Sequence, residues 1–204
     1  MLIFPDKNLT YLATPKTGST AIELALRSRA EIVFSKRRKH MTALRFKTKL
    51  APFLRDTFDI QTETVAVMRS PVDQIRSWYK YRARPAVAGG PRSTGDLTFD
   101  EFVMEVVRDA APDFARIGSQ HAFLTDAKGR LAVDHLFAYE EQEQLLAFLS
   151  ERLGATIELK RKNVSPKIEA TLSTEVETVL RAARPEEFSL YSDLMAAGGH
   201  ITLS

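Results

Sequence analysis

The apolar positions of the chain form short runs that are typical of buried strands, separated by longer segments with helical spacing. The clearest run, residues 64–68, is uninterrupted, as expected for a strand that is covered on both faces. Residues 9–13 are rich in large and β-branched side chains and predict another strand. Three weaker runs predict strands over residues 31–34, 131–139 and, at a sheet edge, 155–159.

Helical patterns fill the intervals between these runs. Ser70 and Pro71 open one helix as an N-cap and a first-turn proline, and residues 98–101 form a capping box that opens another. Apolar spacing predicts further helices over residues 21–29, 41–54, 140–153, 175–183 and 185–197. Strands that alternate with helices are typical of an α/β fold with a mostly parallel sheet, and no break in composition divides residues 1–204 into two domains.

The composition is that of an ordinary globular domain. Apolar residues make up 44% of the 204 positions and charged residues 27%, which argues against a disordered or fibrous chain. The apolar runs are too short to cross a bilayer and the first residues lack the layout of a signal peptide, so we expect a cytoplasmic protein. The absence of cysteine excludes disulfides and thiolate catalysis, and the four histidines lack a metal-ligand spacing, so no metal is expected.

Positive charge is concentrated in one part of the chain. The net charge is only +3, but residues 32–55 contain no acid and eight bases: Lys36, Arg37, Arg38, Lys39, Arg45, Lys47, Lys49 and Arg55. Such a concentration indicates an anionic partner, although a solvated basic helix face would have the same pattern. The run from Lys36 to Lys49 could attract an anionic glycan, anionic lipid headgroups or nucleic acid, and the sequence does not choose among them.

The loop after the strand at residues 9–13 has the parts of a phosphate cradle. Lys16 supplies a mobile cation, Gly18 lets the backbone approach an anion closely, and Ser19 and Thr20 add hydroxyl donors. The following helix directs its free N–H groups to the same place. The alternative is a plain strand–helix turn that uses glycine for its geometry.

This loop is not a Walker A motif. Lys16 precedes Gly18 by two positions, whereas the Walker lysine directly follows the second glycine. The central strand is followed by Arg69, where a kinase or NTPase would keep an acidic magnesium ligand. Both departures point away from metal-assisted phosphoryl transfer.

Two segments together resemble the nucleotide signatures of sulfotransferases that use 3′-phosphoadenosine 5′-phosphosulfate (PAPS). Residues 15–20, PKTGST, are similar to the loop that binds the 5′-phosphosulfate, and residues 69–79 match the 3′-phosphate pattern R-x-P-x-x-x-x-x-S-x-Y. Residues 39–43 and 162–165 resemble the carbohydrate branch that includes the uronyl 2-O-sulfotransferases. The resemblance implies a P-loop NTPase-like three-layer fold with a central sheet flanked by helices.

The resemblance also implies roles for individual residues. Arg69 and Ser77 would hold the 3′-phosphate, with Arg69 in a charge-assisted and bidentate geometry. Residues Asn163 and Ser165 would close over the adenine or the phosphates, although an ordinary turn before Pro166 explains them equally well. The 5′ end of PAPS would be held by Lys16, Thr17, Gly18, Ser19 and Thr20.

The implied reaction is transfer of a sulfuryl group to an acceptor hydroxyl, with Lys16 stabilising the charge on the leaving phosphate and His40 acting as the base. The fallback bases are Glu23, Asp56 and His121. The acceptor is expected to be a carbohydrate or glycoconjugate, for example an anionic glycan, and no nucleic-acid partner is expected. The alternatives are a kinase-like nucleotide-binding enzyme and a non-catalytic binder of anionic polymers, and the oligomeric state stays open.

Four further expectations concern residues around these motifs. Gln120 and His121 could face the acceptor. The Trp78–Tyr79 pair is more typical of a helix-face core than of a base-stacking surface. His135, inside a predicted strand, is expected to be structural, and His200 is expected to be exposed.

Overall fold

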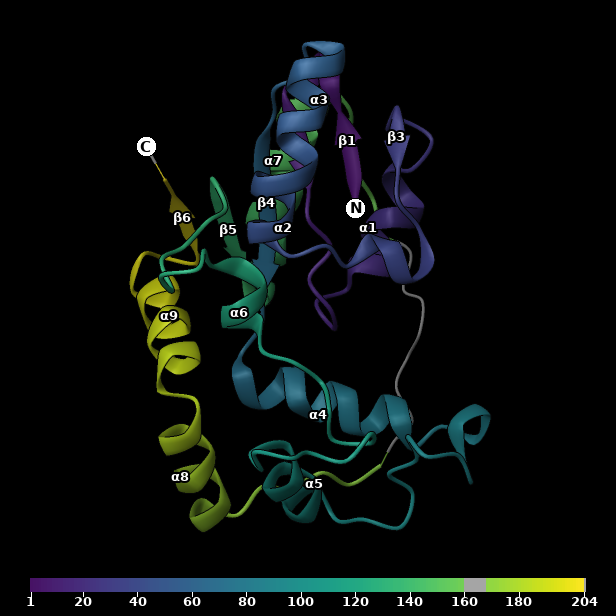
Figure 1. The fold of residues 1–204 in the computed structure, drawn as a ribbon, viewed down its shortest axis with the longest axis vertical. Coiled ribbons are helices and arrows are strands. Elements are labelled where there is room, and N and C mark those ends of the chain that lie inside the picture. The colour runs from purple at the N-terminus through teal and green to yellow at the C-terminus, as the bar shows by residue number, and fades with distance from the viewer. Residues whose placement is uncertain (160–167, 204) are drawn as a thin grey trace.

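A single six-stranded mixed sheet forms the centre of the molecule in the computed structural model, which describes residues 1–159 and 168–203 (Figure 1). Its strand order is β3-β1-β2-β4-β5-β6. The three central strands β2, β4 and β5 pair in parallel, whereas β1, β3 and β6 pair antiparallel with their neighbours. The bounds are β1 Leu2–Phe4, β2 Leu9–Tyr11, β3 Ile32–Val33, β4 Glu63–Met68, β5 His135–Ala138 and β6 His200–Thr202.

Helices cover both faces of the sheet. One apolar cluster packs α2, α3, α6 and α9 on one face, and a second packs α1 and α7 on the other. A third cluster joins α4, α5 and α8 beyond the end of the sheet, in the lower part of Figure 1. The helices are α1 Ser19–Leu26, α2 Ala43–Arg45, α3 Ala51–Phe58, α4 Pro71–Arg82, α5 Phe99–Val106, α6 Gln120–Leu124, α7 Gln142–Leu153, α8 Thr174–Ala183 and α9 Pro185–Ala196.

The α/β prediction is confirmed, and the sheet is flanked by helices as expected. Parallel pairing is confined to the three central strands. The sequence pattern did not predict β1 or β6, which are each only three residues long. The predicted edge strand over residues 155–159 is wrong, since this segment is irregular. The predicted helix over residues 41–54 contains a π-helical turn, Phe46–Leu50, between α2 and α3. No helix in the described ranges is long and apolar enough to span a membrane.

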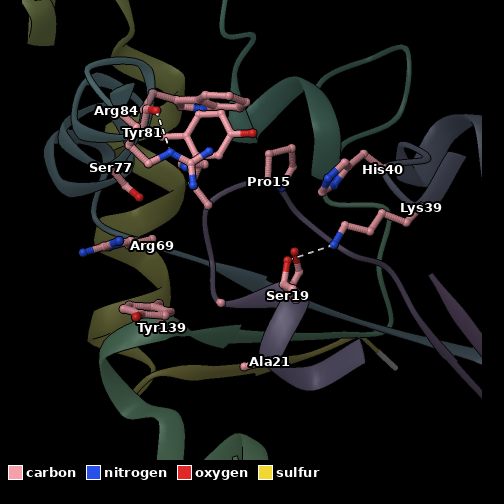
Figure 2. Close-up of a pocket in the computed structure, with 14 residues that line it drawn as sticks. Pro15, Ser19, Ala21, Lys39, His40, Arg69, Ser77, Tyr81, Arg84 and Tyr139 are labelled. Carbon is pink, nitrogen blue, oxygen red and sulfur yellow. Dashed lines mark hydrogen bonds between the residues drawn. The ribbon is translucent and has the colours of Figure 1, made fainter. Parts of the chain in front are cut away.

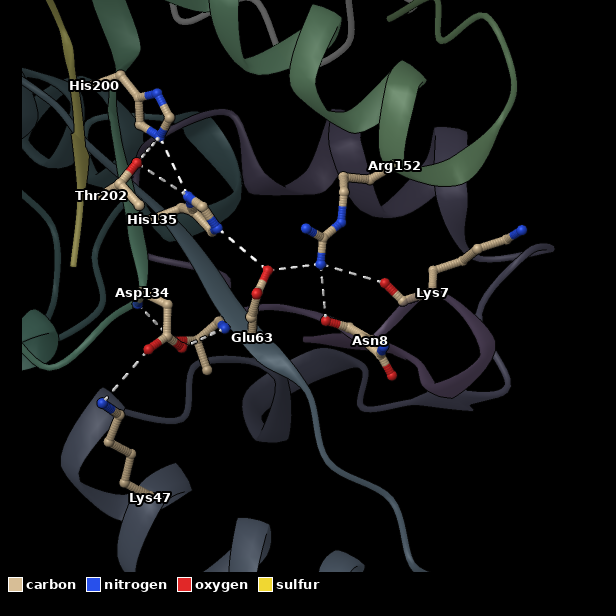
Figure 3. A network of polar contacts seen from close by, with 10 residues as sticks. Lys7, Asn8, Lys47, Glu63, Asp134, His135, Arg152, His200 and Thr202 are labelled. Carbon is tan, nitrogen blue, oxygen red and sulfur yellow. Dashed lines mark hydrogen bonds and ion pairs between the residues drawn. The ribbon is translucent and has the colours of Figure 1, made fainter. Parts of the chain in front are cut away.

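The expectation that His200 is exposed is also wrong. It lies in β6, half-buried, and its ring stacks on Phe137 of β5 at a centroid distance of 3.9 Å. Burial and the neighbouring His135 both lower the pKa of His200. His135 contacts His200 and Glu63 near the start of β5, in the polar network of Figure 3.

Three hydrogen bonds between Thr64 and Asp134 fix the register where β4 and β5 begin. The backbone N–H and the hydroxyl of Thr64 both donate to Asp134 Oδ2, each at 2.7 Å. The backbone N–H of Asp134 donates in return to the Thr64 hydroxyl at 3.0 Å. Arg152 Nη2 pairs with Glu63 Oε2 at 2.6 Å and ties α7 to the same end of the sheet (Figure 3).

Replacing Asp134 should therefore destabilise the sheet. We expect Asp134→Ala to lower the free energy of unfolding by about 2 kcal/mol, because Thr64 then keeps partly buried donors without an acceptor. Asp134→Asn, which keeps one acceptor oxygen, should cost less. Urea unfolding measures both effects, and Asp193→Ala on the exposed side of α9 is the control. Equal stability of Asp134→Ala and the unchanged protein would contradict this account.

Candidate functional site

A polar cavity of about 620 Å³ lies at the carboxyl end of the central parallel strands (Figure 2). Parallel pairing places the ends of β2, β4 and β5 at one edge of the sheet, so the segments that follow these strands meet there. Lys16, Gly18, Ser19 and Thr20 come from the loop after β2 and the start of α1. His40, Arg69 and Ser77 line the same cavity from three other segments. Seven of the site residues expected from the sequence are therefore brought together.

The loop before α1 curls because two residues adopt left-handed backbone conformations. The φ angle is 68° at Lys16 and 72° at Gly18, which is the N-cap of α1. A Cβ atom at Gly18 would lie 3.3 Å from a ring carbon of Tyr139, so glycine suits both the conformation and the space. Ser19 and Thr20, the first two residues of α1, line the cavity, and the first backbone N–H groups of a helix lack partners within it.

Thr17 departs from the expected arrangement. Its side chain is only 1% exposed, and its hydroxyl donates to the backbone oxygen of Thr14 at 2.9 Å. Thr17 does not line the cavity, and its side chain stabilises the loop through the bond to Thr14. Asn163 and Ser165, which the sequence also suggested, lie outside the described residues.

Lys16 is held against two aromatic rings of α4. Its Nζ atom lies 3.9 Å from the ring centre of Tyr81 and 5.0 Å from that of Trp78. Burial, followed by the charges of Arg84, Arg69 and Arg82, lowers the pKa of Lys16 to about 7. The aromatic faces partly replace the water that burial removes from the ammonium group.

Arg69 follows the end of β4, and its guanidinium forms no ion pair with an acidic side chain of the described residues. The guanidinium carbon lies 4.6 Å from the ring centre of Tyr139, and the buried Nε has no hydrogen-bond partner among the described residues. Ser77 of α4 lines the cavity on the same side (Figure 2). A buried donor without a partner is costly, so this corner of the cavity suits an anion.

His40 is positioned with a defined tautomer. Its Nδ1 lies 2.6 Å from the backbone oxygen of Ala13. Because a carbonyl oxygen can only accept, Nδ1 carries the proton and the neutral ring keeps an unprotonated Nε2. Burial lowers the pKa of His40 and the nearby Lys39 lowers it further, while the bond to Ala13 opposes the shift. The neutral, proton-accepting form is therefore favoured near pH 7.

The residue before His40 ties it to the phosphate-type loop. Lys39 is 9% exposed, and its Nζ donates to the Thr20 hydroxyl at 3.0 Å (Figure 2). The same Nζ donates to Glu23 Oε2, also at 3.0 Å. Glu23, a fallback base, is thus paired with a cation. The other two fallback bases, Asp56 and His121, do not line the cavity, and Asp56 pairs instead with Arg55 on α3.

Gln120, which the sequence suggested could face an acceptor, does not line the cavity. Its side chain is 1% exposed and bonds to the backbone of Arg69. Sequence reasoning also missed Trp78, Tyr81, Arg84 and Tyr139 as cavity residues. Trp78 and Tyr81 stand three positions apart on α4, a spacing that places two side chains on one helix face and could have indicated an aromatic wall. The adjacent Tyr79 is core, and its hydroxyl donates to the oxygen of Leu97 at 2.6 Å.

The cavity is strongly electropositive. Its described lining contains Lys16, Lys39, Arg69 and Arg84 and no acidic side chain, and only Lys39 is paired with a carboxylate. Lys36, Arg37 and Arg38 are exposed on the turn that leads to His40. Cations in a partly closed pocket strengthen their attraction for a ligand with several negative charges. Within residues 1–159 and 168–203, no group of three or more His, Cys, Asp or Glu side chains is arranged to hold a metal.

Two sequence comparisons found no relative of the chain. Neither a family model nor a curated protein sequence matches the chain.

The pKa of Lys16 predicts a pH-dependent affinity for anions. Sulfate, a dianion throughout this range, should bind about tenfold more weakly at pH 9 than at pH 6, because Lys16 loses its proton as the pH rises past about 7. Fluorescence of Trp78, the single tryptophan, which lines the cavity, measures the binding.

Two variants assign this effect to the lysine. Lys16→Met should bind sulfate weakly, with an affinity that does not depend on pH. Lys16→Arg should bind sulfate with an affinity that does not fall above pH 7. Lys128→Met, in an exposed turn, is the matched control. A pH dependence that persists in Lys16→Met would show that another group is responsible.

Proposed function

We propose that this protein is a sulfotransferase that moves a sulfuryl group from PAPS to an acceptor hydroxyl. The observation that carries the proposal is that one cavity is lined by the loop residues Gly18–Thr20, by the Arg69–Ser77 pair and by His40. The strand–loop–helix arrangement of β2 and α1 beside parallel β4 also supports a P-loop NTPase-like fold.

The donor set of the cavity fits a nucleotide with two anionic ends. Arg69 and Ser77 would hold the 3′-phosphate, since the buried Nε of Arg69 lacks a partner among the described residues. Lys16, with the backbone and hydroxyls of Gly18, Ser19 and Thr20, would hold the 5′-phosphosulfate. The volume of about 620 Å³ lies in the range of small-molecule sites.

The protonation states of the two catalytic candidates suit the reaction. PAPS supplies the sulfuryl group and a phosphate leaving group. His40 Nε2 is available to take the proton of an acceptor hydroxyl, because Nδ1 is already bonded to Ala13. A bound anion raises the pKa of Lys16, so the lysine is cationic when negative charge develops on the leaving oxygen.

The alternatives are less well supported. A kinase-like enzyme would need an acidic residue where Arg69 stands after β4. A non-catalytic binder of anionic polymers would not need a neutral histidine with a fixed tautomer on the wall of the cavity. The exposed bases Lys36, Arg37 and Arg38 next to His40 favour an acidic carbohydrate as the acceptor.

Nucleotide binding tests the donor site directly. Adenosine 3′,5′-bisphosphate should bind without magnesium and more tightly than ATP, as measured by calorimetry. Arg69→Ala should weaken this binding by about 10- to 100-fold, the usual loss of charge-assisted hydrogen bonds. Arg108→Ala, on the exposed surface of the domain, is the control. A preference for ATP with magnesium would favour the kinase alternative.

Turnover tests the base. With labelled PAPS and a panel of uronate-containing and neutral oligosaccharides, His40→Ala should lower kcat about 100-fold or more while the affinity for the bisphosphate stays unchanged. His121→Ala, a histidine outside the cavity, should keep full activity. Unaltered turnover of His40→Ala would remove His40 as the base.

A further inference from the structure

Arg69 leaves the sheet at a point where its backbone would lose its partners. Strand β4 ends at Met68, and the pairing with β5 ends at the same residue. The N–H and C=O of Arg69 therefore need partners from elsewhere, because buried backbone groups are rarely left unpaired. The side chain of Gln120, the first residue of α6, provides both.

The Gln120 carboxamide matches the Arg69 backbone group for group. The N–H of Arg69 donates to Gln120 Oε1 at 2.9 Å, and Gln120 Nε2 donates to the oxygen of Arg69 at 2.9 Å. Since a backbone N–H can only donate and a carbonyl can only accept, these two bonds fix the orientation of the carboxamide. The Gln120 side chain thus makes the two backbone hydrogen bonds that a residue of a neighbouring strand would make.

A buried carboxylate holds Gln120 in turn. Glu187 of α9 is 2% exposed, and its Oε1 accepts from the backbone N–H of Gln120 at 3.1 Å and from Nε2 at 3.4 Å. Arg184 lies 3.5 Å from Glu187 Oε2 and compensates its charge. On the other side, the N–H of Ser70 donates to Glu140 Oε1 at 3.0 Å. Residues 69 and 70 are thus held from two directions.

The carboxylates of this network bond to the backbone and not to the guanidinium. Glu187 bonds to Gln120 and Glu140 bonds to the backbone of Ser70, and neither forms an ion pair with Arg69 in the described structure. The guanidinium keeps the ring of Tyr139 as its neighbour, and no residue in the described part of the chain bonds to its Nε. The network therefore fixes the backbone of Arg69 and leaves the donors of its guanidinium for a ligand.

We propose that Gln120, held by Glu187, is a positioning residue that directs Arg69 toward the 3′-phosphate of the nucleotide. This inference rests on the proposed function, because it takes the 3′-phosphate as the ligand of Arg69. A residue that aims a charged group affects the affinity for the group's own ligand far more than the affinity for ligands bound elsewhere in the cavity.

The test compares two nucleotides that differ only in the 3′-phosphate: adenosine 3′,5′-bisphosphate and AMP. The unchanged protein should prefer the bisphosphate, and Arg69→Ala should lose that preference. Gln120→Met, of similar shape but without the two bonds, should reduce the preference about tenfold, a loss typical of supporting residues. Its affinity for AMP should stay within about twofold of the unchanged protein. Gln142→Met, an exposed glutamine on α7, is the matched control.

A second variant keeps the proposal testable if Gln120→Met fails to fold. Gln120→Glu places two carboxylates together, so the preference should be weak at pH 7.5 and recover at pH 5.5, relative to the unchanged protein at the same pH. The recovery follows because a protonated carboxyl can again accept from the N–H of Arg69 and donate to its oxygen. A merely structural role would not produce this pH-dependent recovery.

The outcomes separate the two proposals. If the unchanged protein and Arg69→Ala bind both nucleotides equally, the proposed function fails and this inference fails with it. If Arg69→Ala loses the preference but both Gln120 variants keep it at every pH, the proposed function stands and the role of Gln120 is overturned. The positioning role of Gln120 would be established if Gln120→Met loses the preference for the bisphosphate and Gln120→Glu regains it at low pH.

Discussion

Parallel pairing of β4 with both β2 and β5 is the constraint on which the cavity depends. It brings three chain segments to one edge of the sheet, and each segment supplies a different element of the site. The loop after β2 carries the phosphate-type cradle, the end of β4 carries Arg69, and Tyr139 follows β5 to form the surface beneath both. The antiparallel strands β1, β3 and β6 widen the sheet without moving this edge.

The cavity gathers cations that repel one another, and the structure offsets this repulsion in two ways. Lys39 is neutralised by Glu23 and becomes part of the framework that joins α1 to His40. Lys16, Arg69 and Arg84 lie instead against the rings of Tyr81 and Tyr139. Aromatic faces stabilise a cation without cancelling its charge, so the attraction for an anionic ligand is kept. The pKa of Lys16 is lowered mainly by burial and further by the charges of the neighbouring arginines, so part of the repulsion remains.

Much of the site could be predicted because its motifs are local. The loop over residues 15–20 and the segment from Arg69 to Ser77 each combine a strand end, a turn and a helix start, which depend on neighbours in the sequence. The short strands β1 and β6 escaped prediction because three residues carry too little pattern, and they form only by pairing with distant strands. Trp78 was expected in the core because periodicity places it on one face of a helix. Periodicity does not show whether that face packs against the core or lines a cavity, and here it lines the cavity.

The sequence by itself determined the α/β class and the glycine-containing loop with Lys16, because these follow from residue type and short spacing. The candidates His40, Arg69 and Ser77 came from the resemblance of short segments to PAPS-dependent sulfotransferases. Only the tertiary structure decided that Thr17 turns inward, that Tyr139 lies under Arg69, and that Gln120 and Glu187 hold the backbone of Arg69. Gln120 is 51 positions from Arg69 and 67 from Glu187 in the chain. Contacts of that separation come from the packing of α6 and α9 around the end of the sheet, and no local pattern encodes them.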